Sequence, residues 1–371
     1  MNYGETGMKC LSIVGARPQF VKLAPVSRVL RRFCEERILH TGQHYDYVMS
    51  AHFFEELAIP DPDYHLEVGS GSHGAQTARM LEGIEHILQE ERPDWVILYG
   101  DTNSTLAGAL AAAKLAAAKL GLAIAHIEAG LRSFNRDMPE EVNRIVADHV
   151  SDLLFCPTEA ARQHALAEGL NGIEVVGDVM YDLLLQARPT VAERAPALLE
   201  SLEIAPGEYF LATVHRPVNA DDPQAMREIA AALNELPLPV IFPVHPRTRR
   251  RLQEYGVSWS ERVRLIDPVG YLSMLALEQH AVRVLTDSGG VQKEAFLLGV
   301  PCVTLREETE WVETVEARWN VLVGSRREAI LAAVSLPRPP VPTHNPYGFG
   351  DAAERITRTL LGAGPGRQVL Q

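Results

Sequence analysis

The sequence is poor in cysteine and in positive charge, and each shortage excludes a class of protein. Only four cysteines occur, they form no C-x-x-C pair, and they lie far apart along the chain: Cys10, Cys34, Cys156 and Cys302. This pattern favours reduced thiols packed as small apolar residues over a disulfide framework or a zinc site. The net charge of −13 argues against a nucleic-acid or membrane partner.

A long hydrophobic run is also lacking. No apolar stretch reaches the roughly 18 residues that a membrane-spanning helix requires. The N-terminal segment MNYGETGMK is polar and has no apolar core of the kind found in signal peptides. We therefore expect a cytoplasmic protein without a leader or a transmembrane helix.

What the chain has is length and a regular alternation. At 371 residues and 46% hydrophobic content, it exceeds what one core usually supports, which predicts two domains. Short β-rich apolar runs alternate with helix-length amphipathic stretches, which predicts an α/β fold with two doubly wound parallel sheets. The predicted strands lie at 10–16, 37–42, 95–101, 123–129, 153–158 and 173–177, then at 209–215, 240–246, 263–268, 282–288, 301–306 and 320–324.

The domain boundary is expected in the helical, proline-containing stretch that follows Gly177. We predict an N-terminal domain over 1–177, a C-terminal domain over 178–346, and a final helix and tail over 347–371. A cleft between two such domains is where a ligand would be held.

Acidic residues occur in three motifs of the N-terminal half, and each motif follows an apolar run. Asp101 lies in YGDTNST, Glu128 in HIEAGLRS, and Glu140 with Glu141 in MPEEVNR. An acid at the carboxyl end of a buried parallel strand opens into the region where α/β sheets bind ligands. These acids are therefore placed for proton transfer.

The first strand-to-helix turn, GARPQFVK, carries Arg17 and Lys22 instead of glycines. Cations near a helix N-terminus suit a diphosphate or another acidic ligand. The alternative is a solvated helix face. A G-x-G-x-x-G match at 69–74 resembles a nicotinamide fingerprint, but it does not occupy the first βα turn, so we expect a loop there.

A second phosphate candidate is TDSGGVQKE, again between a strand and a helix. Ser288, Gly289 and Gly290 would let backbone amides approach phosphate oxygens, and Glu294 could bind ribose hydroxyls. A tight turn with ordinary capping is the alternative. Two such turns, one in each half, favour a nucleotide ligand.

Histidines also end several predicted strands. His215 is followed by Arg216 and could face a diphosphate, and His245 repeats the arrangement one strand later. His126 lies inside a strand and is expected to be a hydrogen-bonded core residue. Neither an H-E-x-x-H motif nor a G-x-S-x-G elbow occurs, so we expect no metal site and no serine nucleophile.

Several of these motifs occur together in one known order: GARPQFVK, TGQH, GDTNST, HIEAGLRS, PEEVNR, HR followed by Asn219, and TDSGGVQKEA. Over roughly residues 8–361, the sequence resembles the non-hydrolysing UDP-N-acetylglucosamine 2-epimerases. The resemblance implies a GT-B fold, in which two Rossmann-like domains close on a UDP-sugar, and a homodimer. It further implies interconversion of UDP-GlcNAc and UDP-ManNAc without a metal or nicotinamide cofactor, as a supply for surface polysaccharide synthesis.

The resemblance also assigns residues. The hydrogen on C2 of the sugar is not acidic, so inversion is easiest if UDP leaves C1, a base removes the C2 proton and an acid returns one to the other face. The family pattern implies a catalytic set of Asp101, Glu128, Glu140 and His215. It implies a binding set of Arg17, Lys22, Arg144, Ser288, Gly289, Gly290 and Glu294, and a possible activator site of Gln43, Gln76, Arg216 and His245.

Two departures from the family pattern concern the substrate. Many members have glutamate at the position of Val218 and arginine at the position of Trp311. The tryptophan form resembles a branch that includes epimerases of UDP-2,3-diacetamido-2,3-dideoxy-glucuronate. Other readings left open are a GT-B glycosyltransferase, a hydrolysing epimerase, and a nucleotide-sugar sensor without turnover.

Overall fold

The structure is a computed structural model that describes residues 7–43, 47–118, 120–342 and 344–363. The chain forms two compact units, one of Met1–Gln186 with Asn345–Gln371 and the other of Ala187–His344. The division falls after residue 186, within the helical, proline-containing stretch that follows Gly177. The C-terminal segment is part of the first unit and not a separate tail.

The first unit is built on a parallel sheet of seven strands in the order β3-β2-β1-β4-β5-β6-β7. Its strands are β1 (Lys9–Val14), β2 (Glu35–His40), β3 (Tyr64–His65), β4 (Trp95–Tyr99), β5 (Ala123–Ile127), β6 (Leu153–Cys156) and β7 (Ile173–Val175). Its helices are α1 (Arg17–Leu30), α2 (Tyr47–Glu56), α3 (His73–Glu91), α4 (Asn103–Ala117), α5 (Pro139–Val150), α6 (Glu159–Ala167) and α15 (Ala352–Ala363), and α7 (Val179–Ser201) continues from it into the second unit.

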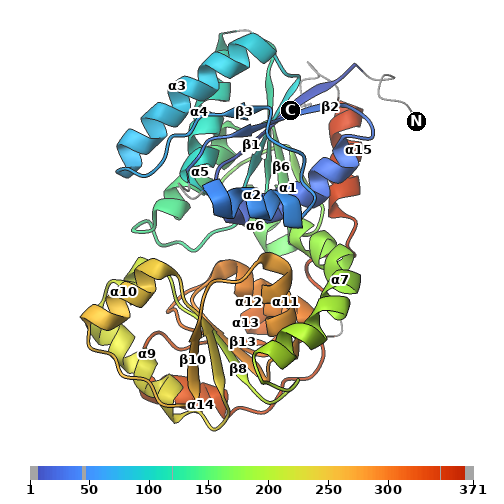
Figure 1. Ribbon diagram of the computed structural model, residues 1–371. Coiled ribbons are helices and arrows are strands. Elements are labelled where there is room, and N and C mark those ends of the chain that lie inside the picture. Colours follow the sequence, from blue (N-terminus) through green and yellow to red (C-terminus); the bar gives the residue numbers. More distant parts are fainter. Residues whose placement is uncertain (1–6, 44–46, 119, 343, 364–371) are drawn as a thin grey trace. The chain divides into compact units, whose positions relative to one another are not determined.

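The central strand of this sheet, β4, is apolar along its whole length because helices cover both faces. All five residues of β4 are buried, as is typical of a parallel strand flanked by helices. On one face α3, α4 and α5 pack side by side, and on the other α1 lies against α15 (Figure 1). The C-terminal helix α15 therefore covers the same face of the sheet as the N-terminal helix α1.

A buried carboxylate fixes the start of α15. Asp182 accepts hydrogen bonds from the backbone amides of Ala352 (3.2 Å) and Ala353 (2.7 Å). Burial raises the pKa of Asp182 to about 6, against the opposing effect of these two hydrogen bonds. An acid at a helix N-terminus satisfies amides that have no partner within the helix.

The second unit repeats this topology with a parallel sheet of six strands in the order β10-β9-β8-β11-β12-β13. Its strands are β8 (Phe210–Thr213), β9 (Val240–Pro243), β10 (Val263–Ile266), β11 (Arg283–Thr286), β12 (Cys302–Thr304) and β13 (Asn320–Leu322). Its further helices are α8 (Pro217–Ala220), α9 (Pro223–Glu235), α10 (Pro246–Glu254), α11 (Tyr271–His280), α12 (Gly289–Leu298), α13 (Val312–Glu316) and α14 (Arg327–Val334).

These elements confirm the predicted α/β class and both parallel sheets. Each predicted strand corresponds to an observed one. Within the match at 69–74, residues 69–72 form a loop, as expected, and residues 73–74 begin α3. Sequence reasoning missed β3, because a strand of two residues has no alternation to detect. None of the described helices offers a stretch long and apolar enough to cross a membrane.

The cysteines are packed as the sequence predicts, although two that are distant in sequence come together. All four thiols are free and buried, but Cys10 of β1 and Cys34, just before β2, lie with their Sγ atoms 3.7 Å apart. The parallel pairing of β1 with β2 brings these residues together. The hydrogen bond with the neighbouring thiol and burial raise the pKa of Cys10, so this sulfur is an unreactive thiol at neutral pH.

Candidate active site

Asp101 lies in the turn between β4 and α4, at the carboxyl end of the sheet, as predicted. Its Oδ2 accepts a hydrogen bond of 2.5 Å from Nη2 of Arg144. The amide of Asn143 donates to the Asp101 backbone carbonyl at 2.9 Å. Asp101 keeps 29% of its side chain exposed, while Arg144 keeps 3%. A buried cation and an amide from α5 therefore hold an accessible carboxylate in place.

Glu128 follows β5, the next strand of the same sheet, and its backbone is unusual. It adopts a positive φ of 70°, a conformation that costs a non-glycine residue free energy and clusters at functional sites. The amides of Glu128 and Ala129 both donate to the carbonyl of Phe155 at 3.1 Å, which stabilises this turn. The positive φ, held by these hydrogen bonds, fixes the direction in which the Glu128 side chain leaves the backbone.

Lys22 of α1 forms an ion pair with Glu128. Its Nζ lies 2.9 Å from Oε1 of Glu128, and less than a tenth of either side chain is exposed. The sequence assigned Lys22 to the nucleotide, and the structure instead places it against a candidate acid. Arg17, at the start of the same helix, lies with its guanidinium 5.0 Å from the ring centroid of Phe53. The two cations of the GARPQFVK turn thus have different surroundings.

The two glutamates of MPEEVNR differ in their surroundings. Glu141 is buried, accepts hydrogen bonds from the backbone amides of Ser133 and Phe134, and lies 3.1 Å from Nη1 of Arg144. It fixes the loop that precedes α5. Glu140, in the first turn of α5, is half-buried, and within the described part of the chain no hydrogen bond or ion pair engages its side chain. Of the two, Glu140 is the one available to a ligand.

Gln43 and Gln76 come together at the N-terminus of α4. Oε1 of Gln43 accepts from the amide of Ser104 at 3.0 Å and from its hydroxyl at 2.8 Å. Nε2 of Gln76 donates to the carbonyls of Gly69 (2.8 Å) and Gln43 (3.2 Å), and its Oε1 accepts from Asn103 (2.8 Å). Both glutamines therefore join the TGQH loop to the start of α4.

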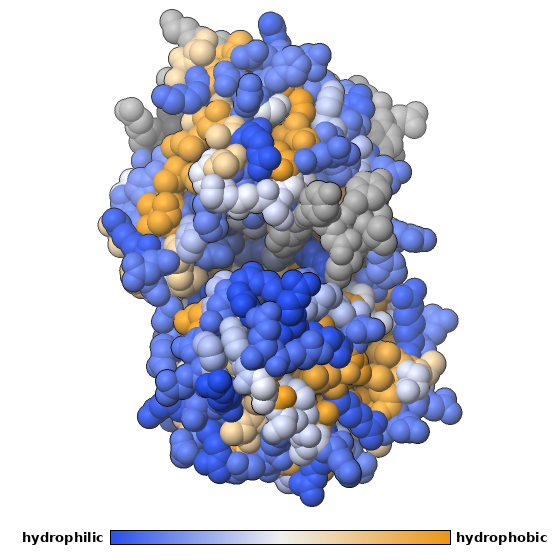
Figure 2. All heavy atoms as spheres, turned by 60° about the vertical axis from the view of Figure 1, so that its left-hand side comes forward, coloured by the Kyte–Doolittle hydropathy of each residue, from blue (hydrophilic) through white to orange (hydrophobic). Residues whose placement is uncertain are grey.

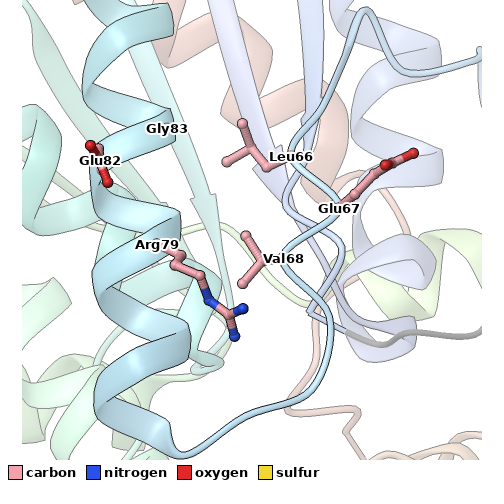
Figure 3. A pocket seen from close by; sticks show the side chains of 6 residues that line it. All are labelled: Leu66, Glu67, Val68, Arg79, Glu82 and Gly83. Carbon is pink, nitrogen blue, oxygen red and sulfur yellow. The ribbon is translucent and has the colours of Figure 1, made fainter.

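A separate hollow of about 300 Å³ opens between α3 and the loop that follows β3. Figure 3 shows Leu66 and Val68 facing the helix, while the carboxylate of Glu67 points away from it. The walls are completed by Arg79, Glu82 and Gly83. None of the candidate acids lines this hollow, so it is distinct from the region of Asp101 and Glu128.

In the second unit the organising residue is Asp287, directly after β11. It is fully buried and accepts hydrogen bonds from the backbone amides of His215 (3.1 Å) and Arg216 (3.0 Å) and from the side chain of Asn219 (3.1 Å). Nδ1 of His215 lies 3.3 Å from the same carboxylate, and about half of the His215 side chain is exposed. Asp287 thus orients the turn after β8.

The glycines at the start of α12 are constrained by their neighbours. Ser288 is the N-cap, with its hydroxyl accepting from the amide of Val291 at 3.4 Å. A Cβ atom added to Gly289 would lie 2.5 Å from Oε1 of Glu310 and 3.4 Å from Nε1 of Trp311. A larger residue at 289 would therefore have to displace the carboxylate of Glu310, which is paired with Arg306, and Gly290 continues the first turn. Free amides at such a helix start can hold an anion.

A polar layer lies beneath this turn. Nζ of Lys293 is 4.0 Å from the ring centroid of Trp311, a distance typical of a cation–π contact. Nη2 of Arg306 pairs with Glu310 at 2.9 Å, and Nη2 of Arg216 lies 4.0 Å from the other oxygen of Glu310. Glu294 is buried on α12. His245 is exposed and caps α10, accepting from the amide of Arg247 at 3.3 Å.

Sequence reasoning therefore missed several contacts of this region. It gave Asp287 no role, although an aspartate directly after a predicted strand was a usable signal. It did not anticipate that the guanidinium of Arg144 pairs with Asp101 and Glu141, and the contact of Arg144 with substrate stays a prediction. No local signal shows that Lys22 reaches Glu128, because the two residues are distant in sequence. Within the described residues, no three His, Cys, Asp or Glu side chains come together as a metal-binding group.

Comparison with known proteins identifies the family. The sequence model described as UDP-N-acetylglucosamine 2-epimerase matches residues 29–361. A Methanococcus maripaludis protein named UDP-N-acetylglucosamine 2-epimerase homolog is 53% identical over 359 residues, covering 95% of this chain and 99% of its own. The UDP-2,3-diacetamido-2,3-dideoxy-D-glucuronate 2-epimerase of Pseudomonas aeruginosa is 50% identical over 364 residues, with coverage of 95% and 99%.

Among solved structures, the UDP-GlcNAc 2-epimerase of Methanocaldococcus jannaschii, in complex with UDP-GlcNAc and UDP, matches with a TM-score of 0.87 and 44% identity. The match covers 95% of this chain and 99% of that one. Both parallel sheets thus correspond to a GT-B-like epimerase fold. With its paired acids after β4 and β5 and a glycine turn after β11, the chain belongs to the UDP-N-acetylglucosamine 2-epimerase family.

Proposed function

We propose that the protein is a non-hydrolysing 2-epimerase that interconverts UDP-GlcNAc and UDP-ManNAc by elimination and re-addition of UDP. The observation that supports this most directly is the pair of carboxylates, Asp101 and Glu128, that follow neighbouring strands and are each paired with a cation. Exchange of a proton at C2 requires groups that accept and return it. The product would serve surface polysaccharide synthesis.

In this proposal Asp101, Glu128 and Glu140 are the proton-transfer groups. Arg144 and Lys22 hold Asp101 and Glu128 in place through ion pairs, which suits a carboxylate that removes the C2 proton. Glu140 has no charged partner among the described residues, which suits a group that exchanges its proton with the ligand. Arg17 and Arg144 contribute positive charge on the same unit.

The nucleotide is assigned to the second unit. The amides after Ser288, at Gly289 and Gly290, would hold phosphate oxygens, and Glu294 would bind ribose hydroxyls. His215, held at its backbone by Asp287, would donate to the departing diphosphate. Retaining UDP is as important as releasing it, because the intermediate must recapture it.

A second substrate, UDP-2,3-diacetamido-2,3-dideoxy-glucuronate, is favoured by specific observations. Trp311 stacks on Lys293 beneath the glycine turn, and Val218, 69% exposed, occupies a position where many family members carry glutamate. The relative from Pseudomonas aeruginosa that is named for this substrate is 50% identical. The same proton transfer at C2 would operate on either sugar.

We also propose a homodimer. On α5 the residues opposite the buried side are apolar, with Val142 exposed and Ile145 and Val146 half-buried. Figure 2 shows bands of apolar side chains on the face of this unit that comes forward. Uncovered apolar area of this kind favours association. Light scattering should give the mass of two chains, and Val142→Lys should shift it toward one.

An activator site for a second UDP-sugar is the least supported part. Gln43 and Gln76 are engaged with each other and with α4, while Arg216 and His245 lie in the other unit. The proposal predicts that Gln76→Ala lowers the cooperativity of initial rates with UDP-GlcNAc concentration. Unchanged cooperativity would remove these residues from any activator site.

The deciding experiment is incubation with each UDP-sugar in D₂O, followed by proton NMR and mass spectrometry, with Asp101→Asn as the inactive control. Deuterium at C2 together with UDP-ManNAc supports the first substrate. Exchange only with the diacetamido sugar supports the second. Free sugar plus UDP identifies a hydrolysing enzyme, and no exchange with either leaves a glycosyltransferase or a sensor.

A further inference from the structure

We propose that His126 carries a proton on both ring nitrogens and, as a buried imidazolium, is the positioning residue that joins the turns bearing Asp101 and Glu128. This inference rests on the proposed function only for the roles of the two acids. The protonation state itself follows from hydrogen-bond geometry and can be tested without activity.

The contacts of the ring are the first step. His126 lies on β5, two residues before Glu128, and is fully buried. Its Nε2 is 2.6 Å from the carbonyl oxygen of Gly100, and its Nδ1 is 2.7 Å from Oδ1 of Asp148. A carbonyl oxygen can only accept a hydrogen bond, so Nε2 carries a proton.

The second step concerns the partner of Nδ1. Oδ2 of Asp148 accepts from the amide of Gly130 at 3.1 Å and from Nη1 of Arg132 at 2.6 Å. Arg132 is a permanent cation, and a carboxylate oxygen that accepts two hydrogen bonds, one of them from a guanidinium, favours the ionised form. Asp148 is therefore an ionised acceptor, and Nδ1 carries a proton as well.

The third step is charge balance. Arg132 also binds Glu168 through two hydrogen bonds of 2.8 and 2.7 Å. The cluster His126–Asp148–Arg132–Glu168 thus contains two cations and two anions, and His149 lies at its edge, 3.8 Å from Glu168. Buried ions are tolerated when each is paired and hydrogen-bonded, and a neutral imidazole would leave one acceptor facing a bare nitrogen.

The cluster links the two turns that carry Asp101 and Glu128. Gly100 immediately precedes Asp101, whereas Gly130 and Arg132 follow Glu128, so the cluster connects the backbone on both acids' turns. Gly100 and Gly130 have φ values of +60° and +77°, and a Cβ on Gly130 would lie 2.3 Å from the carbonyl of Ala161. Neither turn can shift without breaking a hydrogen bond to this cluster.

The protonation state is tested by NMR of protein labelled with ¹⁵N-histidine at pH 7.5. We expect the His126 ring to show a directly bonded proton on both nitrogens, with assignment by loss of the signals in His126→Gln. Neutron diffraction from crystals grown in D₂O gives the same answer without any variant. A nitrogen without its proton in either measurement would overturn the proposal, whatever the enzyme turns over.

The positioning role is tested by steady-state kinetics of His126→Gln. Glutamine cannot donate to both acceptors along the imidazole axis, and a displacement of about 1 Å at reacting groups costs about 100-fold in rate. We expect kcat to fall about 10- to 100-fold, with KM and the Kd for UDP unchanged, because His126 does not contact the ligand.

The matched control is His164→Gln, since Nδ1 of His164 lies 3.2 Å from the carbonyl of Gly130 in the same loop but does not reach Gly100. We expect its kcat to change less than about twofold. Equal losses in both variants would mean a general loosening of the loop, and an unchanged kcat in His126→Gln would exclude the positioning role. If His126→Gln does not fold, the neutron measurement alone decides the protonation state.

Discussion

The two units share one strand order but hold their site carboxylates differently. In the first, the two carboxylates that follow β4 and β5 each have a cation beside them: Arg144 for Asp101 and Lys22 for Glu128. In the second, Asp287 is satisfied largely by backbone amides, and Glu278 has no hydrogen-bond partner among the described residues.

This difference matches a division of labour. In the first unit, Lys22 and Arg144 hold the two carboxylates in fixed positions beside a positive charge, which suits the proposed proton transfer. In the second unit, backbone amides and glycines follow β11, which suits the proposed binding of an anion without proton transfer. The same topology therefore supports chemistry or binding according to which side chains follow its strands.

The largest effect should come from removing a carboxylate of the first unit. Asp101→Asn keeps the shape but cannot accept a proton, so we expect kcat to fall by about 10³-fold or more with the Kd for UDP unchanged. Deuterium exchange at C2 and calorimetric titration with UDP measure the two quantities.

The control for this variant is Asp94→Asn. Asp94 precedes β4 at the opposite edge of the sheet, where it accepts from the amide of Lys9 at 2.8 Å, so kcat should stay near that of the parent. If Asp101→Asn retains full exchange, Asp101 has no role in proton transfer and the contrast between the units loses its basis.

Lys22 tests whether the first unit binds the nucleotide or only tunes its acids. Lys22→Met removes the charge beside Glu128 while keeping much of the buried stem, so we expect kcat to fall about 10- to 100-fold through the altered protonation of Glu128. Binding of UDP, measured by calorimetry, should be unchanged. A large loss of UDP affinity would instead return Lys22 to the nucleotide, as the sequence first suggested.

Gly289→Ala tests the second unit, where we expect a loss of UDP binding and little change in kcat. The new Cβ would lie 2.5 Å from Oε1 of Glu310, which Arg306 and Arg216 hold, so either this carboxylate or the turn must move. We expect part of the shift to fall on the turn and to misalign its amides. We expect about a tenfold weaker Kd for UDP and a higher KM, with kcat nearly unchanged. Gly74→Ala, where an added Cβ meets nothing within 4 Å, is the control. A fall in kcat without a change in Kd would contradict the division of labour.

The smallest effect concerns stability and pH. Burial and the charge of Glu294 raise the pKa of Glu278 well above its ordinary value. Protonated Glu278 contributes fully to the free energy of unfolding when the pH lies below the pKa of glutamate in the unfolded chain. This contribution is lost as the pH rises toward the pKa of Glu278 in the folded protein. Glu278→Gln should remove this loss, which amounts to about 1.4 kcal/mol per pH unit within that window.

Urea unfolding of both proteins between pH 5 and 8 measures the difference in their free energies of unfolding. A dependence of about 1.5 kcal/mol per molar urea converts a shift of the midpoint into this difference. The advantage of Glu278→Gln should grow with pH, while Glu316→Gln, at an exposed position of α13, should show no such trend. A difference that stays constant with pH would show that Glu278 is already charged in the folded protein.

The sequence by itself determined the fold class, the positions of the long strands, and the three segments that carry the acids. These features are local, because apolar runs, turn residues and motif order are written in consecutive positions. The order of the motifs was also enough for the family and for a substrate class of UDP-sugars.

Only the tertiary structure decided which charges pair. Lys22 meets Glu128, Arg144 meets Asp101, and His126 joins Gly100 to Asp148, although each pair is far apart in sequence. Parallel strands bring their carboxyl ends to one edge, and the helices between them set which side chains arrive there. Pairing and burial are properties of that arrangement in space, so no reading of neighbouring residues could supply them.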